Sequence, residues 1–186
     1  MKNCFQFQNQ SVLEHGLSVH AYYMDLRNHI LNQIPLEYEW KLPEWIFDEF
    51  LWSRLLPEEQ IKNYQIYHDC GKPFCIEYDD EGRKHFPDHA NISYQTWLKI
   101  SDNKTIASLI KRDMEIHTMK ADECEAFCND INMASTLLIT GLSELHSNAA
   151  MFGGTDSTSF KIKWKHLNKR GKKIVNIINN QKEIQS

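Results

Sequence analysis

The 186-residue sequence predicts an all-α fold with one small β-hairpin. Apolar residues recur at helical spacing through most of the chain, and only residues 74–86 alternate in character around a glycine turn. Hydrophobic residues make up 41% of the sequence and charged residues 25%, which suits one globular domain with its own core. Seven glycines and five prolines are too few for a linker-rich or disordered protein.

The first half of the chain contains three segments with helix-start signals. Ser11-Val-Leu-Glu14 is a capping-box motif, Pro43 lies in a first helical turn, and Pro57 precedes two glutamates that favour a helix N-terminus. The predicted helices cover residues 11–31, 43–55 and 57–69. Aromatic residues in and just before the second segment are predicted to lie in the core: Trp40, Trp45, Phe47, Phe50 and Trp52.

The second half begins with the hairpin, which turns at Gly82. Helical spacing then returns, with a break at the glycine pair of residues 152–155 and a weak point at Gly171 in the last helix. The predicted helices cover residues 91–100, 103–114, 122–128, 131–151 and 157–180.

Cysteine content and hydropathy predict the compartment. Five cysteines are an odd number, which argues against a disulfide framework and favours a reducing compartment. The N-terminus lacks the apolar core of a signal peptide, and no apolar run approaches the roughly 20 residues that a membrane helix needs. We therefore expect a cytoplasmic protein with no membrane association.

Charge is divided unequally along the chain. Residues 1–156 contain 24 acidic and 13 basic residues, whereas residues 157–186 contain eight basic residues and one acid. Two interpretations of this basic C-terminal segment (155–186) stay open. It binds RNA or DNA through its lysines and interleaved aromatic rings, or it packs Phe160, Trp164, Leu167 and Ile174 on the same domain with its lysines in solvent.

Several of the nine histidines lie beside carboxylates or helix ends. Imidazole and carboxylate groups bind divalent metals, and a lysine next to them can neutralise a phosphate. His68 and Asp69 can reach one ion only where the helix ends, and Gly71 allows such a break. Each residue also has a structural explanation: a histidine at a helix start is often a cap, and Asp113 and His117, four apart, suit a solvated pair on one helical face. The candidates are His15, His68, Asp69, Lys72, His89, Asp113, His117 and Glu144.

The order of these residues resembles the HD-domain superfamily of metal-dependent phosphohydrolases. The segment Tyr67-His-Asp-Cys-Gly-Lys-Pro73 is similar to the family motif, and its continuation to His89 resembles the HD domains of bacterial tRNA nucleotidyltransferases. The resemblance covers residues 11–150. It implies an HD-domain helical bundle over residues 1–154, with the small β-hairpin inserted after the His-Asp motif.

The resemblance also implies a metal site. His15, His68 and Asp69 match three family ligands, and Glu144 lies where the family has an aspartate. Relatives with two metals use two further histidines. His89 matches the first of them, and Asp113 stands at the position of the second. The implied cofactor is one or two divalent ions of Mn, Mg, Fe, Ni or Co.

The implied activity is hydrolysis of a nucleotide or an RNA or oligonucleotide phosphate by metal-activated water. Asp69 would orient that water, while Lys72, His89 and His117 would neutralise the phosphate. The substrate would be a phosphorylated small molecule or nucleotide. The alternative is an HD domain that binds a nucleotide or RNA without turnover, as a sensor or accessory factor.

Overall fold

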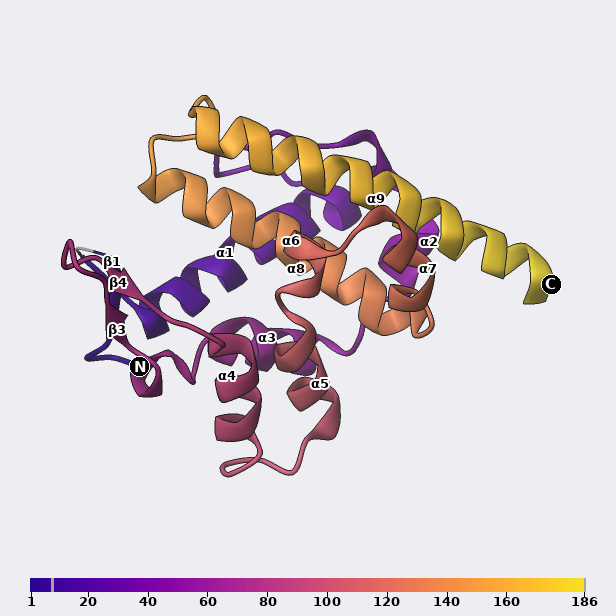
Figure 1. Ribbon diagram of the computed structural model, residues 1–186. Helices are drawn as coiled ribbons and strands as arrows, with labels where there is room; N and C mark the ends of the chain where they lie inside the picture. Colours follow the sequence, from indigo (N-terminus) through magenta and orange to yellow (C-terminus); the bar gives the residue numbers. More distant parts are fainter. Residues whose placement is uncertain (8, 186) are drawn as a thin grey trace. The chain divides into compact units, whose positions relative to one another are not determined.

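The computed structural model describes residues 1–7 and 9–185, and it confirms the all-α class (Figure 1). Short 3-10 helices connect several of the longer elements: η1 (Glu44–Phe47), η2 (Lys72–Phe74) and η3 (Ala121–Glu123). The α-helices are α1 (Val12–Asn32), α2 (Glu49–Ser53), α3 (Glu58–Tyr67), α4 (His89–Trp97), α5 (Lys104–Arg112), α6 (Glu115–Thr118), α7 (Cys124–Phe127), α8 (Ile131–Met151) and α9 (Thr158–Gln185).

The predicted hairpin is present as two short antiparallel strands, β3 (Glu77–Tyr78) and β4 (Lys84–His85). The Asp79 carboxylate fixes the turn because it accepts hydrogen bonds from the backbone N–H groups of Glu81 and Arg83. Gly82 has a φ of +74°, which is a conformation that glycine adopts without strain. The chain thus needs a glycine at the tip of this hairpin.

A second, unpredicted strand pair precedes α1: β1 (Phe5–Phe7) and β2 (Gln10–Ser11). Its sequence alternates phenylalanine with glutamine over too few residues to give a clear strand signal. The pair leads directly into the predicted capping box, in which Ser11 N–H donates to Glu14 and Glu14 N–H donates to the Ser11 hydroxyl. The helix start at this position is confirmed.

The predicted helix over residues 43–55 is divided in two. The η1 turn ends at Phe47, and the carboxylate of the next residue, Asp48, caps α2 by accepting a hydrogen bond of 2.8 Å from the Leu51 N–H. Trp45 and Trp52 are buried as predicted, whereas the prediction of Phe47 in the core is wrong because its side chain is 58% exposed. The break at Asp48 changes the direction of the chain between these aromatic residues.

Contacts divide the chain into two compact units, and the first contains residues 1–20 and 58–114. Within it, α5 contacts both α3 and α4, around a core that includes Ile61, Tyr64 and Leu109. Gly16 lies so close to Ile66 that an added Cβ would be 2.3 Å from the Ile66 carbonyl oxygen. This unit carries the His-Asp motif and the hairpin.

The second unit contains residues 21–57 and 115–186. The helix α9 lies along α8, which is buried over most of its length (Figure 1). Of the four residues expected to pack if the segment is not a nucleic-acid arm, Phe160, Leu167 and Ile174 are buried and Trp164 is half-buried. The helix continues through Gly171, contrary to the expected weak point, because this glycine is buried against the ring of Trp45.

Two further findings concern the predicted compartment. All five cysteines are free and buried, which confirms the prediction that they form no disulfide framework. Among the described helices, none combines the length and apolar character that a membrane span requires.

Candidate metal centre

The candidate site in the first unit is built where α3 ends. The last residue of α3 is Tyr67, so His68 and Asp69 lie in the turns that follow and project toward one region, as neighbours within a helix would not. Gly71 has ordinary helical angles, so it is not needed for an unusual backbone conformation. It is needed for space, because a Cβ there would lie 2.3 Å from the backbone nitrogen of Ser93 in α4.

The Asp69 carboxylate lies at the centre of this site and is only 2% exposed. Its Oδ2 is 3.2 Å from His68 Nε2, 3.8 Å from His15 Nε2 and 2.6 Å from Lys72 Nζ. Its Oδ1 is 3.8 Å from His89 Nε2. The structure therefore brings four of the predicted residues around the buried carboxylate of a fifth, Asp69.

The charges of these neighbours determine the ionisation of Asp69. Burial alone would raise the pKa of its carboxyl, but His68, Lys72 and His15 together outweigh burial and hold the pKa well below its usual range. Neither carboxylate oxygen accepts a hydrogen bond of normal geometry from the described residues. The site therefore presents an ionised carboxylate whose Oδ2 is paired with the Lys72 ammonium.

Hydrogen bonds from the second ring nitrogen orient two of the histidines. His68 Nδ1 is 2.8 Å from the Gln65 carbonyl oxygen, and His89 Nδ1 is 3.0 Å from that of Phe86. Because a carbonyl only accepts, each Nδ1 carries a proton, so the neutral form of either ring has its lone pair on Nε2. This arrangement is typical of metal-ligating histidines. The Nε2 atom is also the atom of each ring that lies near Asp69.

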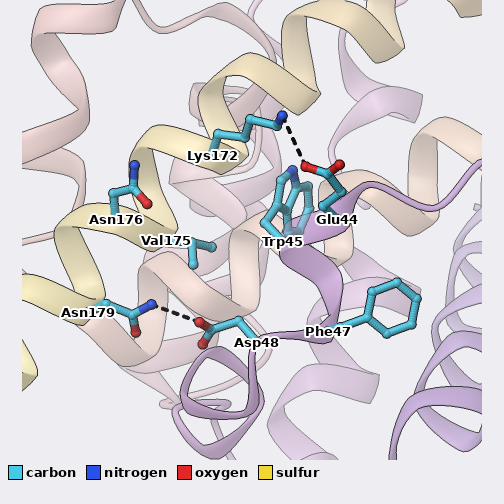
Figure 2. A pocket seen from close by; sticks show the side chains of 8 residues that line it. All are labelled: Glu44, Trp45, Phe47, Asp48, Lys172, Val175, Asn176 and Asn179. Carbon is cyan, nitrogen blue, oxygen red and sulfur yellow. Dashed lines mark hydrogen bonds and ion pairs between the residues drawn. The ribbon is translucent and has the colours of Figure 1, made fainter.

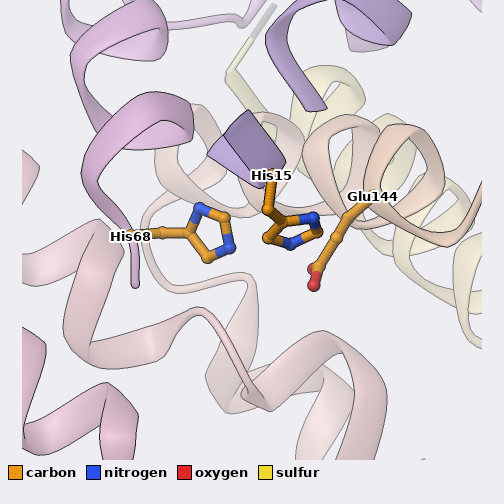
Figure 3. Close-up of side chains that lie close together, drawn as sticks. All are labelled: His15, His68 and Glu144. Atoms are coloured by element: carbon orange, nitrogen blue, oxygen red, sulfur yellow. The ribbon is translucent and has the colours of Figure 1, made fainter. Parts of the chain in front are cut away.

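His15 comes from the first turns of α1, and its ring meets that of His68 edge to face, with 5.2 Å between the centroids (Figure 3). One ligand nitrogen of each ring lies within 4.8 Å of the other. Both side chains are buried. Two imidazoles beside a carboxylate are a donor set suited to divalent transition metals.

Lys72 lies at the edge of the site, where its side chain is 14% exposed. Its ammonium donates to Gln6 Oε1 at 2.8 Å and lies 5.3 Å from the centroid of the Phe86 ring. The lysine thus neutralises Asp69 while keeping partial access to solvent. Gln6 was not predicted as a site residue, since a glutamine in a short N-terminal strand has no sequence signal that links it to the His-Asp motif.

Asp113 is buried and accepts a hydrogen bond from the hydroxyl of Tyr64, whose ring lies edge-on to His68 with centroids 6.4 Å apart. The described contacts thus relate Asp113 to the histidine cluster through Tyr64. The prediction that Asp113 shares a helical face with His117 is wrong, because α5 ends at Arg112 and α6 begins at Glu115. Tyr64 was missed because its apolar spacing indicated only a core residue.

His117 and Glu144 belong to the second unit, where they form a pair between α6 and α8. His117 Nε2 lies 3.2 Å from Glu144 Oε2, and both side chains are largely buried. An unpaired carboxylate in the apolar helix α8 would be costly, and this unit supplies an imidazole as its partner. Figure 3 draws Glu144 together with the two histidines.

Gln65 is a further residue that sequence reasoning missed. Its side chain is fully buried, and its Oε1 lies 2.8 Å from His20 Nδ1, while its backbone carbonyl holds His68. The signal that points to it is its position three residues before His68, one helical turn away. Gln65 thus connects the His-Asp motif to α1.

Comparisons with known proteins do not assign this chain to a family. A scan with family models, a search of curated proteins and a search of solved structures each found no match.

Proposed function

We propose that the protein is a metal-dependent phosphohydrolase of the HD type, which acts on a nucleotide or oligonucleotide phosphate. The observation that carries the proposal is the buried Asp69 carboxylate with His15, His68, His89 and Lys72 around it, as the sequence resemblance implies. Three imidazoles, a carboxylate and an ammonium in one place supply ligands for a metal and a cation for a phosphate.

In this proposal His15, His68 and Asp69 hold a divalent metal ion. Glu144 is the fourth ligand, an assignment that rests on its position in the sequence relative to the family pattern. The orientation of His68 by the Gln65 carbonyl and the ionised carboxylate of Asp69 fit such an ion. His89 and Asp113 would serve a second ion. When bound, the metal would supply a nucleophilic hydroxide near neutral pH and polarise the phosphoryl group.

The protein's own residues would then bind and orient the substrate. The Lys72 ammonium, partly exposed, would transfer from Asp69 to a phosphate oxygen and offset its negative charge. His89, whose Nδ1 is held by Phe86, would present Nε2 to the substrate side of Asp69. Asp69, kept ionised by its neighbours, would help to hold the metal and orient the attacking water.

A second candidate function is binding of a nucleotide or RNA without turnover. The contact of 2.6 Å between Lys72 Nζ and Asp69 Oδ2 favours it, because this lysine already neutralises the buried carboxylate. In such a receptor the ion pair would persist and the histidines would contact the phosphate directly. The two candidates differ in whether a metal is bound and whether a phosphoester is cleaved.

The test is a metal analysis combined with a hydrolysis assay. Wild-type protein and the variants Asp69→Asn, His68→Ala and Lys72→Met would be analysed for bound Mn, Fe, Ni and Co. Each would then be assayed on bis(p-nitrophenyl) phosphate, a nucleoside monophosphate and a cyclic nucleotide. We expect Asp69→Asn and His68→Ala to lose metal and at least about 100-fold in activity. Lys72→Met should keep the metal but raise KM.

The matched control is His166→Ala, which removes an exposed histidine from α9. Circular dichroism would confirm that each variant retains its helices. Full turnover by the Asp69→Asn variant would refute the proposed function. Tight binding of the nucleotide with no turnover under any of the metals would favour the receptor instead.

A further inference from the structure

The helix α9 has one buried face and one strongly basic face. The buried face includes Phe160, Leu167, Ile174 and Ile178. Residues 158–182 contain no Asp or Glu, so the lysines on the remaining surface are not offset by acids of their own helix. The positive charge of the C-terminal segment is therefore presented by one rigid element.

Four lysines of α9 form a row along this exposed face: Lys161, Lys165, Lys169 and Lys172. Their spacing of four, four and three residues places them on one side of a helix, about 6 Å apart along the axis for each step of four. Lys161 pairs with Asp156 and Lys172 pairs with Glu44, but in both pairs the acid is almost fully exposed, so these pairs are weak. The row is thus available to a polyanion.

Two other basic residues of α9 have a structural role. Arg170 donates to the Met119 carbonyl and Lys173 donates to the Ala121 carbonyl, so they hold the segment before α7. The earlier interpretation treated all the lysines of this segment alike. The contacts instead show that Arg170 and Lys173 bind backbone carbonyls of this unit, whereas the four lysines of the row face solvent.

A surface pocket of about 470 Å³ lies at the C-terminal end of the row, between α9 and η1 (Figure 2). Lys172, Asn176 and Asn179 line it from α9, and Glu44, Phe47 and Asp48 line it from the η1 segment. Asn179 donates to the Asp48 carboxylate at 2.7 Å. The pocket therefore combines a largely exposed aromatic ring with amide and carboxylate groups that match the polar edges of a nucleobase.

We propose that this face of α9 binds single-stranded nucleic acid, with the lysine row on consecutive phosphates and one base in the pocket against Phe47. A positive track beside an aromatic ring is the combination that single-stranded nucleic acids require. The amide groups of Asn176 and Asn179 offer donors and acceptors to the base edge, while the two acids are engaged by Lys172 and by Asn179 and the Leu51 N–H. This binding does not depend on the proposed hydrolase activity.

A lipid surface fits the same face less well. Membrane-binding amphipathic helices present several large apolar side chains beside their lysines. On the described part of α9, the only large apolar side chain that is clearly exposed is Ile162, at 54%. A pocket lined by amides and carboxylates also offers no complementary contacts to a lipid headgroup.

The test measures fluorescence anisotropy of a labelled single-stranded RNA, and of a DNA of the same sequence, of about 12 nucleotides. The full-length protein would be used in the presence of a chelator, so that no hydrolysis occurs. With four phosphate contacts, the affinity should fall with a log–log salt slope of about −3, since each contact to a single strand contributes about 0.7. The variant with Lys161, Lys165 and Lys169 replaced by Gln should have a slope of about −1 and at least tenfold weaker binding at low salt.

Phe47→Ala should weaken binding about tenfold and leave the salt slope unchanged, because it removes stacking and no charge. The matched control replaces Lys62, Lys99 and Lys104, exposed lysines of the first unit, by Gln and should bind like the wild type. Equal losses in the control, or no binding by the wild type, would overturn the proposal. Binding to phosphatidylserine vesicles without binding to the oligonucleotides would overturn it in favour of a membrane partner. Because the assay uses no metal, failure of the hydrolase proposal leaves its outcome unaffected.

Discussion

Gly171 in the middle of α9 provides a direct test of the packing in the second unit. A Cβ at this position would lie 2.4 Å from Cε2 of Trp45 and 2.6 Å from two further atoms of the same ring. The Trp45 ring is buried, and its Nε1 donates to Asn168 Oδ1 at 3.0 Å. The ring cannot move away without disturbing that hydrogen bond, so Gly171→Ala should introduce a real clash.

Two opposing effects determine the size of the change. Alanine in place of a helical glycine stabilises a helix by about 1 kcal/mol. Overpacking costs about 1–3 kcal/mol, and a weakened hydrogen bond to Trp45 adds about 1 kcal/mol. The clash outweighs the gain in helix propensity, so we expect a net loss of about 1–3 kcal/mol in the free energy of unfolding. A loss of 2 kcal/mol corresponds to a Tm lower by about 4–8 °C for a chain of this size.

The assay is urea unfolding followed by circular dichroism, carried out as a double-mutant cycle. Gly171→Ala would be measured in the wild type and in a Trp45→Leu background, where the smaller side chain leaves room for the methyl group. In that background the substitution should become neutral or stabilising. Asn180→Ala, at an exposed position of the same helix, is the control for helix propensity alone. A Gly171→Ala protein as stable as the wild type would refute the reasoning.

Three further predictions concern other parts of the chain. Burial lowers the pKa of His146 to about 4, below its value in the unfolded chain. The free energy of unfolding should therefore reach its full value above about pH 6.5 and be about 2 kcal/mol lower at pH 5. His146→Gln should flatten this pH dependence in urea titrations. Gly71→Ala should destabilise by at least about 2 kcal/mol in the same assay, because the clash is with the backbone of Ser93 and cannot be relieved by a side-chain rotation. Ser11→Ala should cost about 1 kcal/mol through loss of the capping box, and stability equal to the wild type would show that α1 does not depend on it.

The pH effect at His146 has a specific structural cause. The protonated Nδ1 donates to the Leu142 carbonyl at 2.8 Å, and Nε2 accepts the N–H of Lys41 at 3.0 Å. A second proton on Nε2 would face the Lys41 N–H, so the folded state disfavours the charged ring in addition to the effect of burial. No sequence pattern predicts this residue, because its partner lies more than a hundred positions away in the chain.

Much of the candidate site was predictable because its signals are local. The capping box fixed the start of α1 and therefore the position of His15 on it, and Pro57 fixed the phase of α3, which ends just before His68. The site residues that the sequence did not predict depend on contacts between positions far apart in the chain. Gln6 reaches Lys72 across 66 positions, and Tyr64 reaches Asp113 across 49. A polar residue acquires a role in the site through such partners, and the partners are known only from the fold.

The glycines show most clearly where sequence reasoning stops. A glycine within a helical segment predicts a weak point, and one after a helix predicts an unusual backbone angle. Gly16, Gly71 and Gly171 show neither, since Gly16 and Gly171 lie within helices and Gly71 has ordinary helical angles. Each is glycine because a Cβ would lie less than 2.5 Å from an atom of another segment. A glycine can be required for its backbone freedom or for its lack of a side chain, and the sequence shows the same residue in both cases. Only the position of the neighbouring segment in the fold distinguishes the two reasons. The substitutions at Gly71 and Gly171 therefore test the packing of each unit more directly than the propensity of its helices.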